Sequence, residues 1–259
     1  MAQIEINRVI SDSHIHIGQW YDHYLTPKEL SRFAKRHSIM SIALSSTSIC
    51  CNDYSAALDE IASAIEMAFA DIVPVLWITS SMIEDDAVQM FIDSDIKWKC
   101  IKIHPKIDKD YWLQRNSQKI LLSLARRMQC PILIHTGEME YCYPLEYEKV
   151  IQDNPDIKFI MAHGRPLDQS IAILSQCANS YVDTAFMPIT DIMKISSLGF
   201  SNRIIWGTDY PIGLYATSCL RYNLEYQYRL LQLKVRLPKI EYEQITNTNF
   251  KNLFYGKIR

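Results

Sequence analysis

The sequence of 259 residues has no excess of either charge. Lys and Arg together number 27 and Asp and Glu number 29, which gives a net charge of −2 and a pI near 6.4. Proteins that bind nucleic-acid backbones usually carry a clustered basic excess, and attraction to an anionic membrane surface needs polybasic segments. We therefore expect neither nucleic acid nor a membrane as a partner.

Long apolar runs and cysteine pairs are also missing. No run approaches the ~20 residues of a membrane-spanning helix, and the N-terminal residues show no basic segment followed by an apolar stretch, the mark of a secretory signal. The 7 cysteines are odd in number and contain no CxxC pair, which is typical of free thiols in a reducing compartment. We expect a cytoplasmic protein whose cysteines are small buried hydrophobic residues.

Linkers, low-complexity tracts and internal repeats are absent too, so we expect one domain spanning residues 1–259. What recurs is a short apolar, β-branched run, repeated at a spacing of roughly 20–35 residues that suits a βα unit. The eight runs are Val9–Ile10, Ile39–Leu44, Ile72–Ile78, Cys100–Ile103, Ile132–Ile134, Phe159–Ala162, Tyr181–Val182 and Ile204–Trp206. Their near-continuous apolar character predicts strands that are covered on both faces.

Helical patterns lie between these runs. Residues 57–69 and 120–128 carry apolar side chains at i, i+3, i+4 and i+7. The first helix is expected to begin after Thr26, with Pro27 at its first position and Glu29 completing a capping box. Eight strands that alternate with helices could form an open sheet or a closed barrel.

The turn after the first strand gives one argument for choosing between the open sheet and the closed barrel. Residues 12–18 contain a single glycine, which argues against a dinucleotide-binding open sheet. The distribution of histidines favours the barrel. We therefore predict a single (β/α)₈ TIM barrel of the metallo-dependent hydrolase type.

Most histidines follow predicted strands. Five of the 7 lie at or just after a strand end, where about one would be expected by chance, and barrel enzymes build their active sites at these ends. The five are His14, His16, His104, His135 and His163. We therefore expect the active site at this face of the barrel.

His14 and His16 are separated by one residue. Side chains at i and i+2 of an extended chain point to the same face, so both imidazoles could reach one metal ion. Asp209 follows the last apolar run and adds a carboxylate. Imidazole and carboxylate are suitable ligands for Zn²⁺ or a similar divalent ion.

Five short motifs carry a family resemblance. They are His14-Ile15-His16, Lys102-Ile103-His104-Pro105, Ile134-His135-Thr136-Gly137-Glu138, Ala162-His163-Gly164 and Gly207-Thr208-Asp209-Tyr210-Pro211. In this order the sequence resembles the amidohydrolase superfamily, and within it the branch of predicted TIM-barrel metal-dependent hydrolases related to aminocarboxymuconate-semialdehyde decarboxylase. The resemblance implies that His14, His16, His135 and Asp209 bind metal. It also implies that His163 binds a second metal or acts on the substrate.

Lys102 leaves two arrangements open. In dihydroorotase-like relatives a lysine on the fourth strand is carboxylated and bridges two metal ions. The string Lys102–Pro105 also resembles the branch with one ion, in which Lys102 and His104 would line the substrate pocket. We favour one divalent ion, with zinc as the first choice, over two ions bridged by carboxylated Lys102. Without such a role, a buried lysine would need an ion partner, for which Glu138 and Asp183 are candidates.

The expected reaction follows from the metal. Metal-activated water would attack a carbonyl carbon of a small amide, lactone or ester, Asp209 would take the proton, and His163 would polarise the carbonyl. The substrate-binding candidates are Lys102, His104, Glu138, Arg165 and Tyr210, and the aromatic loop of Trp20, Tyr21, His23 and Tyr24 could form a pocket wall.

Two other functions stay open. One is a lyase, a decarboxylase or hydratase of an unsaturated or aromatic carboxylic acid on the same metal site. The other is a catalytically degenerate barrel that only binds a ligand. In each case the partner is a small molecule, and a carboxylated one suits the basic candidates. Association into a homo-oligomer also stays open.

Overall fold

The computed structural model describes residues 10–20, 23–212 and 219–256; Val9 and Tyr21, named above, lie outside these ranges. Its strands are β1 (Ile10–Trp20), β2 (His23–Leu25), β3 (Ile39–Ser46), β4 (Asp71–Trp77), β5 (Cys100–Ile103), β6 (Ile132–His135), β7 (Phe159–Ala162), β8 (Ser180–Asp183) and β9 (Ile204–Ile205). Each predicted apolar run overlaps one strand, although the first shares only Ile10 with β1. The unexpected strand is β2, which folds back antiparallel on the end of β1.

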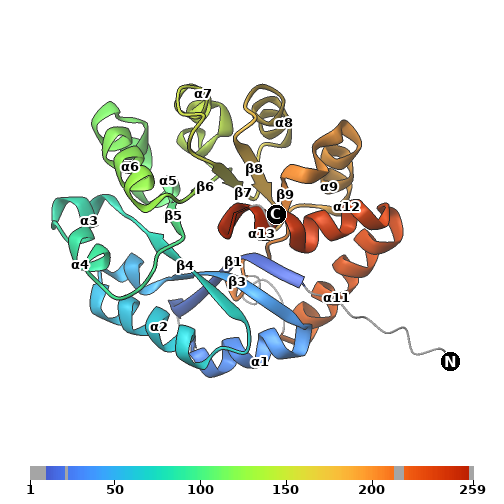
Figure 1. Cartoon of the computed structure of the whole chain (residues 1–259), viewed down its shortest axis with the longest axis horizontal. Coiled ribbons are helices and arrows are strands. Elements are labelled where there is room, and N and C mark those ends of the chain that lie inside the picture. Colours follow the sequence, from blue (N-terminus) through green and yellow to red (C-terminus); the bar gives the residue numbers. More distant parts are fainter. Residues whose placement is uncertain (1–9, 21–22, 213–218, 257–259) are drawn as a thin grey trace.

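The sheet is a closed parallel barrel. Strands β1 and β3 to β9 follow one another in parallel register. Segments at the two ends of this order then join: Ser13 N donates to Trp206 O at 2.8 Å, and His16 N donates to Tyr210 O at 2.7 Å. The architecture is therefore the predicted TIM barrel, with helices around a ring of strands (Figure 1).

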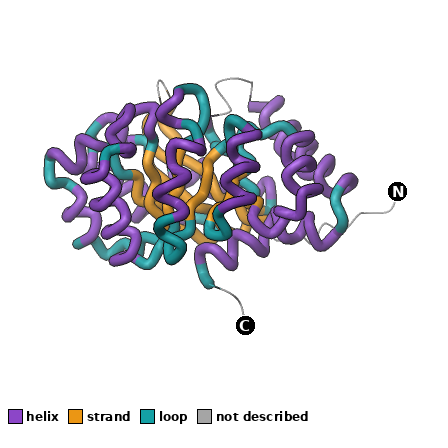
Figure 2. The backbone as a smooth tube through the Cα atoms, turned by 90° about the horizontal axis from the view of Figure 1, so that it is seen from above, coloured by secondary structure: helices purple, strands orange, loops and turns teal. Residues whose placement is uncertain are grey.

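Helices cover the outside of the strands, as Figure 2 shows. They are α1 (Pro27–His37), α2 (Tyr54–Met67), α3 (Ser80–Glu84), α4 (Val88–Ile92), α5 (Pro105–Asp108), α6 (Arg115–Met128), α7 (Glu148–Gln152), α8 (Leu167–Gln176), α9 (Ile189–Ile195), α11 (Cys219–Arg236), α12 (Lys239–Glu243) and α13 (Asn249–Phe254). The predicted capping box of α1 is confirmed, because Thr26 Oγ1 accepts from Glu29 N and Glu29 Oε2 accepts from Thr26 N. No helix in the described ranges is both long and apolar enough to cross a membrane.

The barrel interior is apolar at the end opposite to the C-terminal ends of the strands. A buried cluster gathers inward-facing residues from the strands with two aromatic residues of α13: Ala43, Val73, Val75, Cys100, Leu133, Ile160, Ala162, Ile205, Phe250 and Phe254. Successive strand residues alternate between this cluster and the larger core under the helices. With this end filled, polar groups collect at the opposite end, where the strands finish.

The cysteines only partly follow the prediction. Cys100, Cys130, Cys142 and Cys177 are buried free thiols, but Cys50 and Cys51 are exposed. The reason is their place in a short 3₁₀ turn, η1 (Ser48–Cys51), which follows β3 at the rim of the barrel. The expectation of buried cysteines was therefore wrong for this adjacent pair.

Candidate active site

A cavity of about 580 Å³ opens at the C-terminal ends of the strands. Its lining is rich in imidazoles, cations and indole rings: His16, Trp20, Cys50, Trp77, Lys102, His104, Lys106, Ile107, His135, Glu138, His163, Arg165, Phe186, Asp209 and Ile212. This is the face at which the sequence predicted an active site. The predicted substrate-binding residues Lys102, His104, Glu138 and Arg165 all lie in the lining.

His14, His16 and Asp209 converge beside this cavity. His14 and His16 lie on β1, and Asp209 lies on the turn that closes the barrel, where its N–H donates to His14 O at 2.7 Å. Asp209 Oδ1 is 3.3 Å from His14 Nε2 and 3.0 Å from His16 Nε2. One ligand atom from each residue lies within 4.8 Å of the others, a spacing that fits a single metal ion.

The hydrogen-bond pattern of His14 shows that these atoms suit a cation. His14 Nδ1 lies 2.8 Å from Asp183 Oδ2, an acceptor, so Nδ1 carries the proton and Nε2 presents a lone pair. Asp209 Oδ1, which faces Nε2, is buried and accepts no hydrogen bond from the described residues. Two acceptors turned toward each other in a buried site need positive charge beside them, which the ammonium of Lys102, 3.0 Å from Nε2, supplies in part and a divalent ion would complete. The residues present therefore fit a divalent ion.

The protonation states agree with this fit. Burial, and then the charge of Lys102, lower the pKa of both His14 and His16 to about 3. Burial by itself would raise the pKa of Asp209, but the adjacent His14 and His16 hold it well below its usual range. At neutral pH the site thus offers neutral imidazoles and an ionised carboxylate, the forms in which these groups bind metal.

Asp183 and Asp12 hold the candidate ligands in place. Asp183 Oδ1 accepts from His163 N at 2.8 Å and from Ala185 N at 3.0 Å. Asp12, whose pKa burial raises to about 7, accepts from His14 N at 3.1 Å and from Thr208 Oγ1 at 2.8 Å. The sequence analysis overlooked Asp12. Its signal was available, since it lies two residues before His14 and so shares its strand face.

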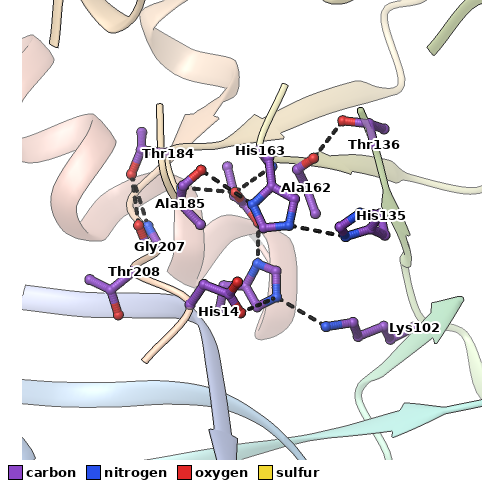
Figure 3. A network of polar contacts seen from close by, with 12 residues as sticks. His14, Lys102, His135, Thr136, Ala162, His163, Thr184, Ala185, Gly207 and Thr208 are labelled. Carbon is purple, nitrogen blue, oxygen red and sulfur yellow. Dashed lines mark hydrogen bonds and ion pairs between the residues drawn. The ribbon is translucent and has the colours of Figure 1, made fainter. Parts of the chain in front are cut away.

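Lys102 lies against the same two imidazoles. Its Nζ is 3.0 Å from Nε2 of His14 (Figure 3). It is also 3.0 Å from Nε2 of His16 and lies 4.4 Å from the centre of the Trp77 ring. Burial lowers the pKa of Lys102 to about 8. Its observed partners are thus the imidazoles instead of the expected Glu138 or Asp183, because β5 aims the side chain across the barrel toward β1.

His163 and His135 form a second group of imidazoles. His163 Nε2 is 3.1 Å from His135 Nδ1, and His163 Nδ1 is 3.2 Å from the carbonyl oxygen of Ala185 (Figure 3). One nitrogen of His163, together with atoms of His14 and Asp183, also meets the spacing for a metal ion. In the described part of the chain, His135 belongs to neither set of potential ligands. Its other nitrogen, Nε2, lies 3.1 Å from Glu138 Oε2.

The carboxylate of Glu138 forms ion pairs with two positively charged side chains at the cavity wall. Its carboxylate lies 3.2 Å from Lys106 Nζ and 3.1 Å from Arg165 Nη2. The hydrogen bond with His135, and then those with Lys106, lower the pKa of Glu138 to about 2. Lys106 was missed in the sequence; it lies in the short helix α5, which follows β5, so the alternation of strand side chains gave no signal for it. Arg165 Nε is buried and has no hydrogen-bond partner among the described residues.

Three residues of the site have an unusual backbone. Glu138, His163 and Asp209 have φ values of 70°, 69° and 55°, in the left-handed region that non-glycine residues seldom adopt. Such conformations persist only where the surroundings enforce them, and they collect at functional sites. His163 directly follows β7, and Glu138 and Asp209 lie three and four residues after the ends of β6 and β9. All three side chains line the cavity at the barrel mouth.

Tyr210 does not join the described lining of the cavity. Its ring stacks on Phe33 with centroids 3.7 Å apart, and only 8% of the residue is exposed. The backbone of Tyr210 serves the closure of the barrel instead. From the predicted aromatic wall, Trp20 lines the cavity, whereas His23 and Tyr24 belong to β2.

The amidohydrolase family model matches residues 94–234, just over half of the chain. The match covers the strands that carry Lys102, His104, His135, His163 and Asp209. The comparison with curated proteins finds no match.

Solved structures resemble the chain over nearly its whole length. An uncharacterised TIM-barrel protein, Bb4693 from Bordetella bronchiseptica, is 14% identical with a TM-score of 0.72, covering 96% of this chain and 99% of that chain. A 5-carboxyvanillate decarboxylase from Novosphingobium aromaticivorans, complexed with manganese and 4-hydroxy-3-methoxy-5-nitrobenzoic acid, is 11% identical with a TM-score of 0.71, covering 97% of each. A probable 2-pyrone-4,6-dicarboxylic acid hydrolase from Acinetobacter baumannii, with citric acid bound, is 12% identical with a TM-score of 0.67, covering 96% and 100%. At such low identities the likeness shows the fold.

Proposed function

This chain belongs to the amidohydrolase family, and we propose that it is a metal-dependent hydrolase that acts on an amide, lactone or ester of a small carboxylated molecule. The observation that carries the proposal is the convergence of one ligand atom each from His14, His16 and Asp209 within 4.8 Å beside the active-site cavity. A divalent ion held there would supply Lewis acidity, which activates water and polarises a carbonyl group.

The chain's own residues divide the remaining tasks. Asp209 stays ionised because of its imidazole neighbours, so its carboxylate can accept a proton from the attacking water and return it to the leaving group. His163 lines the cavity, and its Nδ1 donates to Ala185 O, so the neutral ring carries a lone pair on Nε2. His163 would polarise the carbonyl group once Nε2 has taken up a proton. Burial of these groups strengthens their electrostatic interaction with the substrate.

A carboxylate on the substrate suits the remaining lining. Lys102, Lys106 and Arg165 all reach the cavity, and among the lining residues only Glu138 and Asp209 oppose them with negative charge. Arg165, which lines the cavity, can bind a carboxylate through paired N–H groups. The ion would add further positive charge, so a substrate with at least one carboxylate would be held firmly.

Decarboxylation or hydration on the same site is the second candidate. It is favoured by the Novosphingobium decarboxylase, which binds an aromatic acid and manganese on the same fold. The flat rings of Trp77, His104 and His135 stack on one another, with centroids 5.3 Å and 3.8 Å apart. Such a wall would accept a planar acid as readily as a lactone.

We propose zinc as the ion, one per chain, held by His14, His16 and Asp209. We also propose a reducing, cytoplasmic setting, which agrees with the free cysteines named above.

Metal analysis and a substrate panel test the proposal together. Protein stripped with a chelator and reloaded with Zn²⁺ or Mn²⁺ should bind one ion per chain, measured by plasma mass spectrometry. Lactones, esters, amides and aromatic or unsaturated carboxylic acids are then screened by product mass. Loss of CO₂ indicates decarboxylation, cleavage into two products indicates ester or amide hydrolysis, and gain of water indicates lactone hydrolysis or hydration according to which substrate reacts. The Asp209→Asn variant should keep its circular dichroism spectrum and lose turnover. A chain that binds no ion, or an Asp209→Asn variant with normal turnover, contradicts the proposal.

A further inference from the structure

Phe186 occupies a backbone position that suits glycine. It lies in the connection from β8 to α9, where Met187 N donates to Thr184 O at 3.0 Å and closes a four-residue turn. Phe186 is the third residue of this turn and has φ +56°. Turns with a positive φ at that position favour glycine or asparagine. The chain therefore keeps a large aromatic side chain where local geometry disfavours one.

The turn is held rigidly from two sides. Arg229 of α11 donates through Nη2 to Thr184 O at 2.9 Å and to Met187 O at 2.8 Å. On the other side, Ala185 N donates to Asp183 and Ala185 O accepts from His163. These contacts connect the turn to residues beside the candidate metal centre. They fix the backbone from which the Phe186 side chain extends.

The ring stands between two hollows. Phe186 lines the active-site cavity, and its ring centre is 5.8 Å from that of His163. It also lines a second, open hollow of about 770 Å³ between the turn and α11, whose other lining residues are Met187, Pro188, Ile189, Glu225, Tyr228, Arg229 and Gln232. Phe186 is the residue common to both linings among the described residues. It is also 41% exposed, so the ring itself covers little core.

We propose that Phe186 is a specificity-determining residue, a wall that separates the active-site cavity from the hollow along α11 and so limits how far a bound acid extends. This inference rests on the proposed function, and it narrows the substrate class to small, compact carboxylic acids. A residue retained against its backbone preference is expected where its side chain serves function. Removing the ring joins the two hollows, and a longer acid can then enter.

The test compares a short and a long aromatic acid. Benzoate and biphenyl-4-carboxylate are titrated into the Zn²⁺-loaded wild type and into the Phe186→Ala and Phe186→Gly variants, with binding followed by ligand-observed NMR. We expect the ratio of the two dissociation constants to shift at least tenfold toward the longer acid in both variants. Phe186→Gly should also melt at a higher temperature than Phe186→Ala, because glycine tolerates the positive φ.

Tyr228→Ala is the matched control. Tyr228 is another exposed aromatic residue that lines the hollow but not the active-site cavity, so its loss widens the hollow without joining the two. Its ratio of dissociation constants should equal that of the wild type. The same ratio in wild type and both Phe186 variants, including the case in which neither acid binds, overturns the inference. Failure of the proposed function would appear separately, as absence of bound ion or of turnover in the wild type.

Discussion

Oδ2 of Asp183 lies 2.8 Å from Nδ1 of His14, across a sequence separation of 169 residues. This contact selects the tautomer in which Nε2 of His14 faces Asp209. Partners of this kind orient metal-binding imidazoles and raise their basicity. Asp183 also accepts from two backbone N–H groups, so both of its oxygen atoms are engaged.

The Asp183→Asn variant should therefore bind the ion about 10- to 100-fold more weakly. An amide has a single acceptor oxygen and cannot satisfy all three donors, so either the His14 contact or the turn contacts must break. Isothermal titration of the metal-free protein with Zn²⁺ measures the loss. Ser45→Ala, which removes the neutral hydroxyl 2.9 Å from His16 Nδ1, is the control and should cost less affinity. Wild-type affinity in Asp183→Asn would show that the contact does not orient the ligand.

Lys102→Met should raise the affinity for the ion by about tenfold, because a buried positive charge no longer opposes a divalent cation. Methionine keeps the length of the side chain and a favourable contact with Trp77. The number of ions per chain should stay at one, measured by plasma mass spectrometry. Lys102→Arg keeps the charge and should not gain affinity. A fall from two ions to one in Lys102→Met would instead identify Lys102 as a carboxylated bridge.

Gly207→Ala should disturb the spacing between Asp209 and β1. A Cβ at this position would lie 2.9 Å from Ser13 Oγ and 3.0 Å from His14 Cβ, so the turn must move away from His14. We expect a loss of about 1–3 kcal/mol in the free energy of unfolding, together with weaker binding of Zn²⁺. Urea denaturation and calorimetric titration measure the two effects.

The Gly199→Ala variant distinguishes a loss of stability from a loss of affinity for Zn²⁺. No atom lies within 4 Å of a Cβ built on Gly199, but its φ is +87°, so alanine there is strained without touching the site. This variant should lose stability and keep its affinity for Zn²⁺. Equal losses of affinity in both glycine variants would mean that Gly207 acts through general destabilisation.

The metal-free protein should lose stability steeply as the pH falls from about 6 to 4. Burial lowers the pKa of His14, His16 and His163 to about 3, whereas the unfolded chain takes up these protons near pH 6.5. The unfolded state binds more protons in this window, so each histidine removes about 1.4 kcal/mol per pH unit. Asp12 acts in the opposite direction, because burial raises its pKa to about 7.

Three histidines less Asp12 contribute a slope of about 3 kcal/mol per pH unit. Burial also lowers the pKa of His104 and His135, which adds to this slope, and raises the pKa of Asp183, which reduces it. Urea denaturation at pH 7, 6 and 5 measures this slope. The His163→Gln variant should reduce the slope by the contribution of one histidine, about 1.4 kcal/mol per pH unit. The same free energy of unfolding at pH 6 and pH 5 would contradict the assignment of neutral, buried imidazoles.

The sequence by itself determined the features that depend on local patterns. Apolar runs marked each of the eight barrel strands, and Thr26 with Glu29 marked the start of α1, because strand burial and helix capping leave signals within a few residues. The spacing of His14 and His16 predicted a shared face for the same reason. The polar residues at strand ends predicted where a site would form, since all parallel strands of a barrel finish at one face.

Only the tertiary structure decided which of these groups touch. Lys102 meets His14 across 88 residues, and Tyr210 packs into the core although its neighbour Asp209 faces the site. Lys102 contacts the imidazoles of β1 instead of the expected carboxylates because of how distant segments pack. The position of Phe186 between the two hollows has the same origin. Such contacts depend on the three-dimensional course of the backbone, and the residues on either side in the sequence carry no local trace of them.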